Sequence, residues 1–238
     1  MDGFSYVNIF ETKGIEYIVI IVFLLMLIPF WIILNKKKEI VVEIRKAIVL
    51  LSSKIKSSPQ GLYYTNNHTW TFMERSGAAT LGVDDLLMHV AGDVRLNFLK
   101  SPDDEIKKGD LIAVAEHQGK QLGIFSPISG KILKTNFSLQ EQTGIMREDP
   151  YGNGWLYSVK PSAWKAETQD YYLAEDAKSW LTKEMERLRD FMAVKLSRYA
   201  PEHAHIVLQD GGELSENLLD EMPEEMWQDF QKEFLDPR

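Results

Sequence analysis

Cysteine is absent from the 238 residues of this chain. Its absence excludes disulfides, thiolate metal sites, cysteine-ligated iron–sulfur clusters and a cysteine nucleophile. The sequence also lacks phosphate-binding glycine loops, the zinc motif H-E-x-x-H and the nucleophile motif G-x-S-x-G. With no catalytic constellation in view, we expect no enzymatic activity, and a redox role would need an added cofactor.

A basic surface of the kind that binds nucleic acid is also lacking. The formal net charge is -8, and it is unevenly spread. Residues 15–63 carry 7 basic and 3 acidic side chains, whereas residues 164–238 carry 9 basic and 18 acidic ones. Proteins that bind nucleic acid need a concentration of positive charge on the reading surface. We therefore expect protein partners and no nucleic acid.

One long hydrophobic run is present near the start of the chain. Residues 15–34 are apolar except for Glu16 and hold Pro29, with Tyr17 and Trp31 near the two ends. Twenty residues in a helix would reach about 30 Å, the thickness of a bilayer's hydrocarbon core. The run predicts a transmembrane helix, and it lacks the small-residue cleavage site of a signal peptide.

The residues after this run set its expected orientation and a second helix. Lys36, Lys37 and Lys38 follow directly, and positive charge stays on the cytoplasmic side. We expect a single-pass inner-membrane protein with its N-terminus outside and most of the chain in the cytoplasm. Residues 37–57 then place apolar side chains at intervals of three and four, which predicts an amphipathic neck helix that packs on its own domain or on a partner.

From residue 63 to residue 160 the pattern changes to short β-like runs between turn signals. The turns carry glycine or proline, and the runs between them are typical of a small sandwich or barrel. We expect strands at residues 70–73, 79–83, 94–99, 111–115, 123–125, 130–135 and 155–159. A helical turn is expected at residues 84–90.

Six motifs in this region, in the same order and spacing, resemble the H protein of the glycine cleavage system. The first resembles that family's opening Y-T-x-x-H-x-W, and the second its T-V-G-I-T-D. The motifs are Tyr64-Thr65-Asn66-Asn67-His68-Thr69-Trp70, Thr80-Leu81-Gly82-Val83-Asp84-Asp85, Gly92-Asp93-Val94, Ile106-Lys107-Lys108-Gly109-Asp110, Ser126-Pro127-Ile128-Ser129-Gly130 and Glu148-Asp149-Pro150-Tyr151-Gly152-Asn153-Gly154-Trp155-Leu156. The resemblance spans about 100 residues and bears more on the fold than on the activity.

The resemblance implies a flattened β-barrel, a lipoyl-domain-like barrel-sandwich hybrid of two small sheets that presents a hairpin. In the family, a lysine near the tip of that hairpin is amide-linked to lipoic acid. The lipoyl arm carries an aminomethyl group and reducing equivalents between partner enzymes, and the protein itself catalyses nothing. We therefore expect a mainly β fold, with a transmembrane helix before it and a helical extension after it.

The hairpin of this chain departs from the family pattern by one position. The family reads E-x-x-K, then six residues, then S-P; here Glu116 and Ser126-Pro127 keep that distance, and Gly119 stands at the lysine position. Lys120 lies one residue later. In an extended strand such a shift turns the side chain to the other face, although a glycine with positive φ could absorb it. Three interpretations of Lys120 stay open. It is an unmodified exposed lysine, which we favour; a shifted lipoyl lysine; or a residue that contacts a partner.

The C-terminal extension is predicted to be helical and acidic. A helical stripe of apolar residues extends from about residue 170 to residue 199, and Pro201 ends it. A last helix is expected after Met222-Pro223, with acidic residues in its first turn. This tail fits either docking on a basic partner surface or folding back on its own domain.

Two further features are weak candidates for chemistry. His203 and His205 could form a metal pair, but no third ligand is near in sequence, so we expect a surface strand at residues 204–208 and no metal site. Asp84-Asp85 and residues 103–105 are acidic clusters at turns, where we expect solvated carboxylates.

These expectations divide the chain into four parts: an N-terminal segment with the transmembrane helix at residues 1–35, a neck at 36–61, the H-protein-like β domain at 62–163 and the acidic extension at 164–238. The favoured hypothesis is a non-catalytic accessory or scaffolding subunit of a membrane complex, with a redox or respiratory complex suggested by analogy. In this hypothesis we expect the chain to carry no cofactor. The alternative is a membrane-tethered carrier with lipoate on Lys120.

Overall fold

The computed structural model describes residues 17–32, 59–199, 218–220 and 222–237. The chain divides into two compact units, one within residues 1–43 and one within residues 44–238. The predicted neck helix at 37–57 and the predicted strand at 204–208, with His203 and His205, lie outside the described residues.

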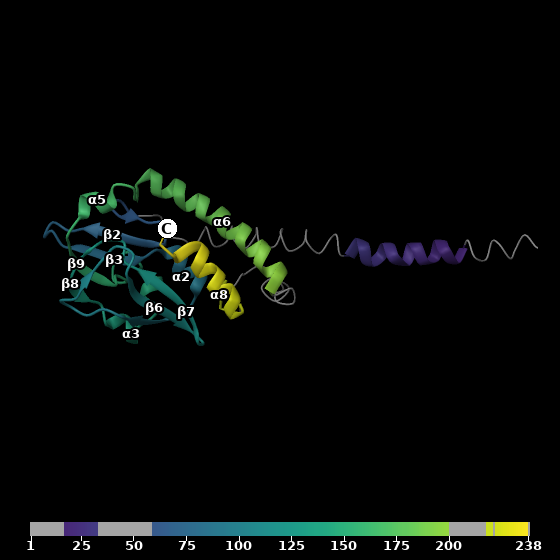
Figure 1. The fold of residues 1–238 in the computed structure, drawn as a ribbon, viewed down its shortest axis with the longest axis horizontal. Coiled ribbons are helices and arrows are strands. Elements are labelled where there is room, and N and C mark those ends of the chain that lie inside the picture. The colour runs from purple at the N-terminus through teal and green to yellow at the C-terminus, as the bar shows by residue number, and fades with distance from the viewer. Residues whose placement is uncertain (1–16, 33–58, 200–217, 221, 238) are drawn as a thin grey trace, which may run out of the picture. The chain divides into compact units, whose positions relative to one another are not determined.

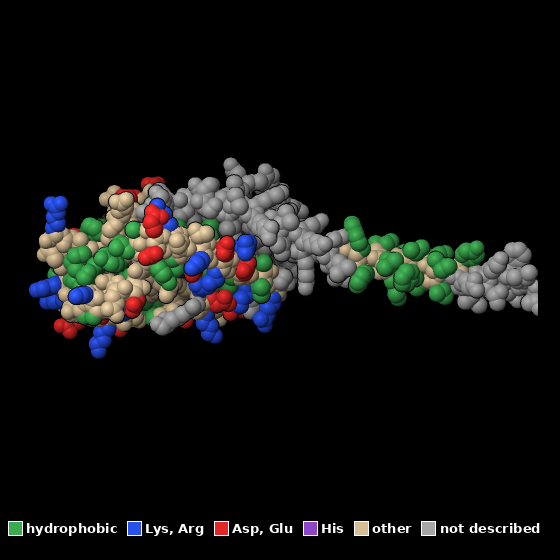
Figure 2. All heavy atoms as spheres, turned by 90° about the horizontal axis from the view of Figure 1, so that it is seen from above, with side chains coloured by type: hydrophobic (Ala, Val, Ile, Leu, Met, Phe, Trp, Pro, Cys, Tyr) green, Lys and Arg blue, Asp and Glu red, His purple; other side chains and the backbone are tan. Residues whose placement is uncertain are grey.

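In the first unit, residues 17–32 form a helix whose hydrophobic side chains are exposed (Figure 2). Within the described part of the chain, no helix is both long enough and apolar enough to span a membrane. The predictions of a transmembrane helix and of a single-pass inner-membrane localisation are therefore wrong.

The second unit is built on two antiparallel sheets (Figure 1). The larger has seven strands in the order β10-β1-β2-β3-β9-β8-β5, and the smaller has three in the order β4-β6-β7. The strands of the larger sheet are β1 (Tyr63–Tyr64), β2 (Thr69–Met73), β3 (Ala79–Val83), β5 (Glu105–Ile106), β8 (Gly130–Thr135), β9 (Tyr157–Pro161) and β10 (Tyr172–Leu173). Those of the smaller sheet are β4 (Arg95–Phe98), β6 (Leu111–His117) and β7 (Lys120–Phe125).

The two sheets face each other across an apolar core. Leu81 from the larger sheet and Leu96, Ile112 and Leu122 from the smaller one are at most 1% exposed. Tyr157 joins the sheets, since its hydroxyl donates to the carbonyl of Ile112 at 2.7 Å. The mainly β fold predicted from the short punctuated runs is confirmed.

Short helices close the ends of the sheets. At the end of β3 the chain turns into α2 (Asp85–Ala91), whose N-cap is Asp84 and whose C-cap is Gly92 at φ 76°. The Asp84 carboxylate accepts from the backbone N–H of Leu87 at 2.9 Å, which satisfies a donor that the helix leaves open. The other short helices are α3 (Ser138–Glu141), α4 (Ile145–Glu148) and α5 (Trp164–Thr168).

A second core lies under the long helix α6 (Glu175–Tyr199), which covers part of the larger sheet (Figure 1). Its Trp180 is 6% exposed and stacks on Tyr172 of β10 at 5.3 Å between ring centroids. Leu62, Tyr64, Trp70 and Ala177 complete this aromatic cluster. The helix predicted from the apolar stripe therefore packs on the chain's own domain.

The last helical elements are α8 (Glu224–Phe230) and a five-residue π-helix, η1 (Gln231–Leu235). In Figure 1 they lie beside β7 and beneath α6. Their apolar residues Met226, Trp227, Phe230, Phe234 and Leu235 are buried. The acidic tail thus folds back on its own domain.

Gly82 in β3 offers a stability test of the second core. A Cβ atom at this position would lie 2.4 Å from the Trp70 ring, so Gly82→Ala must displace a buried indole. We expect urea denaturation to show a loss of about 1–3 kcal/mol in the free energy of unfolding, the usual cost of overpacking. Gly144→Ala is the control, because Gly144 is exposed, has φ -62° and has open space around it. Equal stabilities for the two variants would contradict the packing.

Candidate functional site

The β6–β7 hairpin is the candidate site, and a two-residue turn closes it. His117 pairs with Lys120, and between them Gln118 and Gly119 take φ values of 48° and 84°. Two successive positive φ values are the signature of a tight turn that matches the twist of a hairpin. Gly119 therefore stands at the tip, and a Cβ atom there would meet nothing within 4 Å.

Lys120 begins β7 beside this tip, and its amine is held by the C-terminal segment. Its Nζ donates to the carbonyl of Asp220 at 2.5 Å and to that of Met222 at 3.0 Å, and it lies 5.2 Å from the centre of the Trp227 ring. Partial burial lowers the pKa of Lys120, and the charge of Asp220 offsets part of that effect. Lys120 is half-buried and not solvent-exposed as expected, because residues a hundred positions later contact its amine. That it is unmodified stays a prediction.

The same C-terminal segment also contacts His117, which pairs with Lys120 across the turn. The His117 imidazole contacts the Asp220 carboxylate through Nε2 and stacks on Trp227 at 6.2 Å between ring centroids. The Trp227 indole N–H donates to the carbonyl of Leu219 at 2.7 Å, which orders the turn before α8. The Leu219 N–H in turn donates to the carbonyl of Val90 at the end of α2.

A third contact lies further along β7, the edge strand of the smaller sheet. The side-chain amide of Gln231 accepts from the Gly123 N–H at 2.7 Å, and its nitrogen lies 3.5 Å from the Gly123 carbonyl. Gln231 thus pairs with β7 as the peptide group of a neighbouring strand would. An edge strand otherwise presents unpaired backbone groups to other chains.

Glu116 keeps the position of the family glutamate but does not contact Lys120. It lies in β6 opposite Gln121, and its carboxylate accepts from the Asn97 side chain at 3.2 Å. The structure therefore brings Lys120 together with the C-terminal segment, and it places Glu116 against β4 instead.

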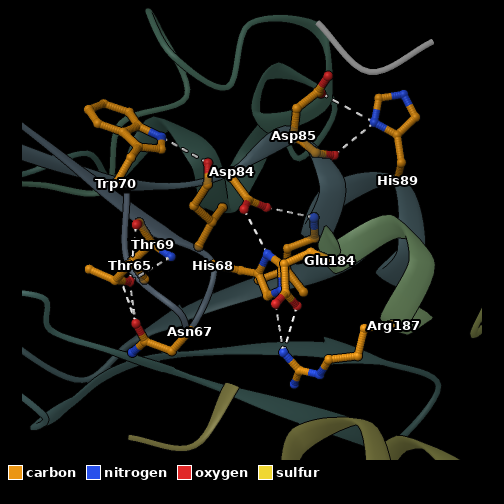
Figure 3. Close-up of polar contacts among 12 residues, drawn as sticks. Thr65, Asn67, His68, Thr69, Trp70, Asp84, Asp85, His89, Glu184 and Arg187 are labelled. Carbon is orange, nitrogen blue, oxygen red and sulfur yellow. Dashed lines mark hydrogen bonds and ion pairs between the residues drawn. The ribbon is translucent and has the colours of Figure 1, made fainter. Parts of the chain in front are cut away.

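A buried ionic cluster joins the β domain to the extension (Figure 3). The His68 Nδ1 lies 2.7 Å from the Asp84 carboxylate, and its Nε2 lies 3.7 Å from that of Glu184 in α6. Arg187 holds Glu184 from its other side through two contacts of 2.7 and 2.8 Å. Arg187 also donates to the carbonyl of Glu233 and lies 4.1 Å from the Phe234 ring, so the cluster reaches η1.

The electrostatics of this cluster favour its charged forms. Burial by itself lowers the pKa of His68, but Asp84 and Glu184 more than offset that effect, and the pKa rises to about 9. Burial raises the pKa of Glu184, whereas His68 and Arg187 lower it, and the net result is a lowered pKa. Near neutral pH, His68 is therefore a cation between two carboxylates.

The sequence alone did not indicate this cluster. Asp84 and Asp85 were expected to be solvated at a turn, yet they are 2% and 0% exposed. Asp84 caps α2 and binds His68, and Asp85 pairs with His89 at 3.2 Å. The sequence holds one local indication of the cluster: Glu184 and Arg187 are three positions apart, and side chains at that spacing meet on a helix surface.

No group of three or more potential metal ligands is found in the described part of the chain. A groove of about 960 Å³ lies elsewhere, over the larger sheet. Its wall includes Phe72 and Leu133, which are 40% and 43% exposed. The groove is lined by Pro59, Gln60, Leu62, Trp70, Phe72, Glu74, Ser76, Gly77, Ala78, Thr80, Leu133, Lys134, Tyr151, Gly152, Trp155, Ser158 and Lys160.

Comparison with known proteins points to one family. The family model described as "Glycine cleavage H-protein" matches residues 62–185. The glycine cleavage system H protein of Coxiella burnetii is 34% identical over 101 residues, which are 42% of this chain and 78% of that protein. That of Ralstonia nicotianae is 34% identical over 108 residues, 44% of this chain and 83% of that protein. A crystal structure of the Mycobacterium marinum H protein aligns with 52% of this chain and 99% of that one, at 23% identity and a TM-score of 0.44. The chain belongs to the glycine cleavage H-protein family.

Proposed function

We propose that this chain is a non-catalytic accessory or scaffolding subunit of a protein complex, built on the H-protein fold and carrying no lipoate. The observation that carries the proposal is the environment of Lys120, whose amine is bound by the carbonyls of Asp220 and Met222 under the Trp227 ring. A lipoyl carrier must instead present a free amine to its ligase and its lipoyl arm to its partners.

The residues at the hairpin do not fit a lipoyl group. Amide formation removes the charge of the amine and two of its protons, so Lys120 could not keep both carbonyl contacts after modification. The position that matches the family lysine is Gly119, which has no side chain. Both the contacts of Lys120 and its shifted position therefore support an unmodified lysine.

Protein partners are proposed because the larger sheet keeps an open surface. Phe72 and Leu133 expose hydrophobic side chains beside the groove, and exposed apolar patches of this kind are typical of protein contacts. Extraction of the full chain and identification of co-purifying proteins tests this part. A chain that purifies alone as a monomer would contradict the accessory-subunit role.

The absence of lipoate is tested by intact-mass spectrometry of the full chain made in cells with an active lipoate ligase. We expect the unmodified mass, because the Lys120 amine is already bound. A mass increase of one lipoyl group that disappears in Lys120→Arg would contradict the proposal. A known H protein expressed in the same cells shows that the ligase is working.

The second candidate is a lipoyl carrier modified at Lys120. The hairpin favours it in one respect: Glu116 and Ser126-Pro127 retain the family spacing, and the two-residue turn brings Lys120 next to the tip. This function would require the C-terminal segment to leave the hairpin.

A further inference from the structure

The described residues 218–220 and 222–235, named the C-terminal cap from here on, close the hairpin through a few polar contacts. Four of its polar contacts reach β7 and the end of β6: the carbonyls of Asp220 and Met222 bind Lys120, Asp220 contacts His117, and Gln231 pairs with Gly123. Together these contacts occupy the Lys120 amine, the His117 imidazole and the edge of β7. Each is a group that a partner could otherwise bind.

Other residues of the cap, on either side of Gln231 in the sequence, pack on α6. Lys195 lies 2.7 Å from the Asp229 carboxylate and 3.3 Å from that of Glu233. Arg187 binds the Glu233 carbonyl and lies against Phe234. Phe230 and Phe234 stack at 4.7 Å between ring centroids, with Phe191 of α6 against both. The cap is therefore held at two separate places, the hairpin and α6.

The two sets of contacts differ in burial. The rings of Phe230 and Phe234, which pack against α6, are each 2% exposed. At the hairpin the side chains of His117 and Asp220 are 12% and 28% exposed, and water therefore reaches these contacts more easily. Segments that move in regulation come from the less stable parts of a fold.

We propose that the C-terminal cap is a displaceable autoinhibitory segment, which opens at the hairpin and thereby controls access to the Lys120 amine and to the β7 edge. The inference rests on the proposed function, since it explains why Lys120 is spared. It goes further in stating that the hairpin is a latent site that the chain closes with its own tail.

The test is acetylation of the folded full chain by the N-hydroxysuccinimide ester of acetic acid, followed by peptide mass spectrometry. Lys134 is the internal standard, because it is exposed and lies on β8. We expect Lys120 to react about tenfold more slowly than Lys134, because the reagent must await local opening. The lowered pKa of Lys120 would by itself favour the reactive neutral amine, so slow reaction reports coverage.

Two variants and a control identify the segment responsible. Gln231→Ala removes the contact with Gly123, and Trp227→Ala removes the ring over Lys120. We expect each to raise the rate at Lys120 by about fivefold or more, while the rate at Lys134 stays unchanged. Gln228→Ala is the control, because Gln228 is exposed on α8 and bonds to Glu224 within that helix.

The outcomes separate this inference from the proposed function. If Lys120 reacts as fast as Lys134 in the wild type, or stays slow in both variants, the cap does not control access and the inference is overturned. A chain that carries no lipoate yet reacts rapidly at Lys120 would refute the cap alone. A chain lipoylated at Lys120 in the intact-mass experiment would refute the proposed function.

Discussion

Replacement of His68 by glutamine is expected to lower the free energy of unfolding by about 3–5 kcal/mol, the cost of removing one partner from a buried ionic pair. His68 is 1% exposed and lies between the carboxylates of Asp84 and Glu184. Its loss leaves Asp84 without its cationic neighbour and weakens the contact between the β domain and α6. Urea denaturation of the two proteins at pH 6.5 measures the difference. Lys131→Gln, which breaks an exposed pair with Asp103, is the control and should leave the free energy of unfolding nearly unchanged.

The same residue predicts how stability depends on pH. The pKa of His68 is raised in the folded protein from 6.5 to about 9. Its stabilisation is therefore present in full below pH 6.5 and is lost as the pH rises through 9. A shift of this size corresponds to about 3 kcal/mol. The wild type should lose stability over this interval, and His68→Gln should show a smaller loss; parallel pH profiles would contradict a charged His68.

The second large effect that we expect is a loss of stability in Trp227→Ala. Trp227 is 1% exposed, stacks on His117 and donates to the Leu219 carbonyl, and a buried tryptophan replaced by alanine costs about 3–5 kcal/mol. The hydrogen bond of Gly123 with Gln231 should break when the C-terminal cap loosens. Hydrogen exchange should therefore speed up in the peptides of β7, with little change in those of β2 and β3.

The matched control for this variant is Trp164→Ala. Trp164 in α5 is half-buried against Tyr63, at 5.4 Å between ring centroids, and does not contact the hairpin. It should leave exchange in β7 unchanged. If Trp227→Ala also left β7 protected, the cap would be held by contacts other than those at the hairpin.

Local patterns predicted the elements of the β domain better than their partners. The strands at residues 79–83 and 130–135 match β3 and β8, because glycine and proline mark the turns around them. The apolar stripe of α6 indicated which face would be buried but not that Trp180 would stack on Tyr172. An apolar stripe indicates which face of a helix is buried. The residues that pack against that face depend on the tertiary structure.

The sequence predicted where the candidate site lies but not which residues contact it. The spacing of Glu116 and Ser126-Pro127 located the hairpin and identified Gly119 at the position of the family lysine. The contact of Lys120 with Asp220 and Met222 joins residues about a hundred positions apart, which no local pattern reports. The same holds for His68 and Glu184, whose ion pair depends on where α6 docks.

The two-residue strands β5 and β10 and the π-helix η1 were also not predicted. Two residues are too few to show alternation, and a π-helix shares the apolar spacing of an α-helix over so short a length. The transmembrane prediction depended on the apolar run from residue 15 to residue 34, whereas no helix in the described part of the chain is long and apolar enough to span a membrane.

The most direct test of whether Lys120 stays free of lipoate is the intact mass of the full chain from cells with an active lipoate ligase, measured beside that of Gly119→Lys. The variant returns a lysine to the tip, where a side chain has open space, at a cost of about 1–2 kcal/mol for its positive φ. We expect an unmodified wild type and a lipoyl group on Gly119→Lys, which would show that the ligase recognises this hairpin. A wild type that carries lipoate on Lys120 would contradict it.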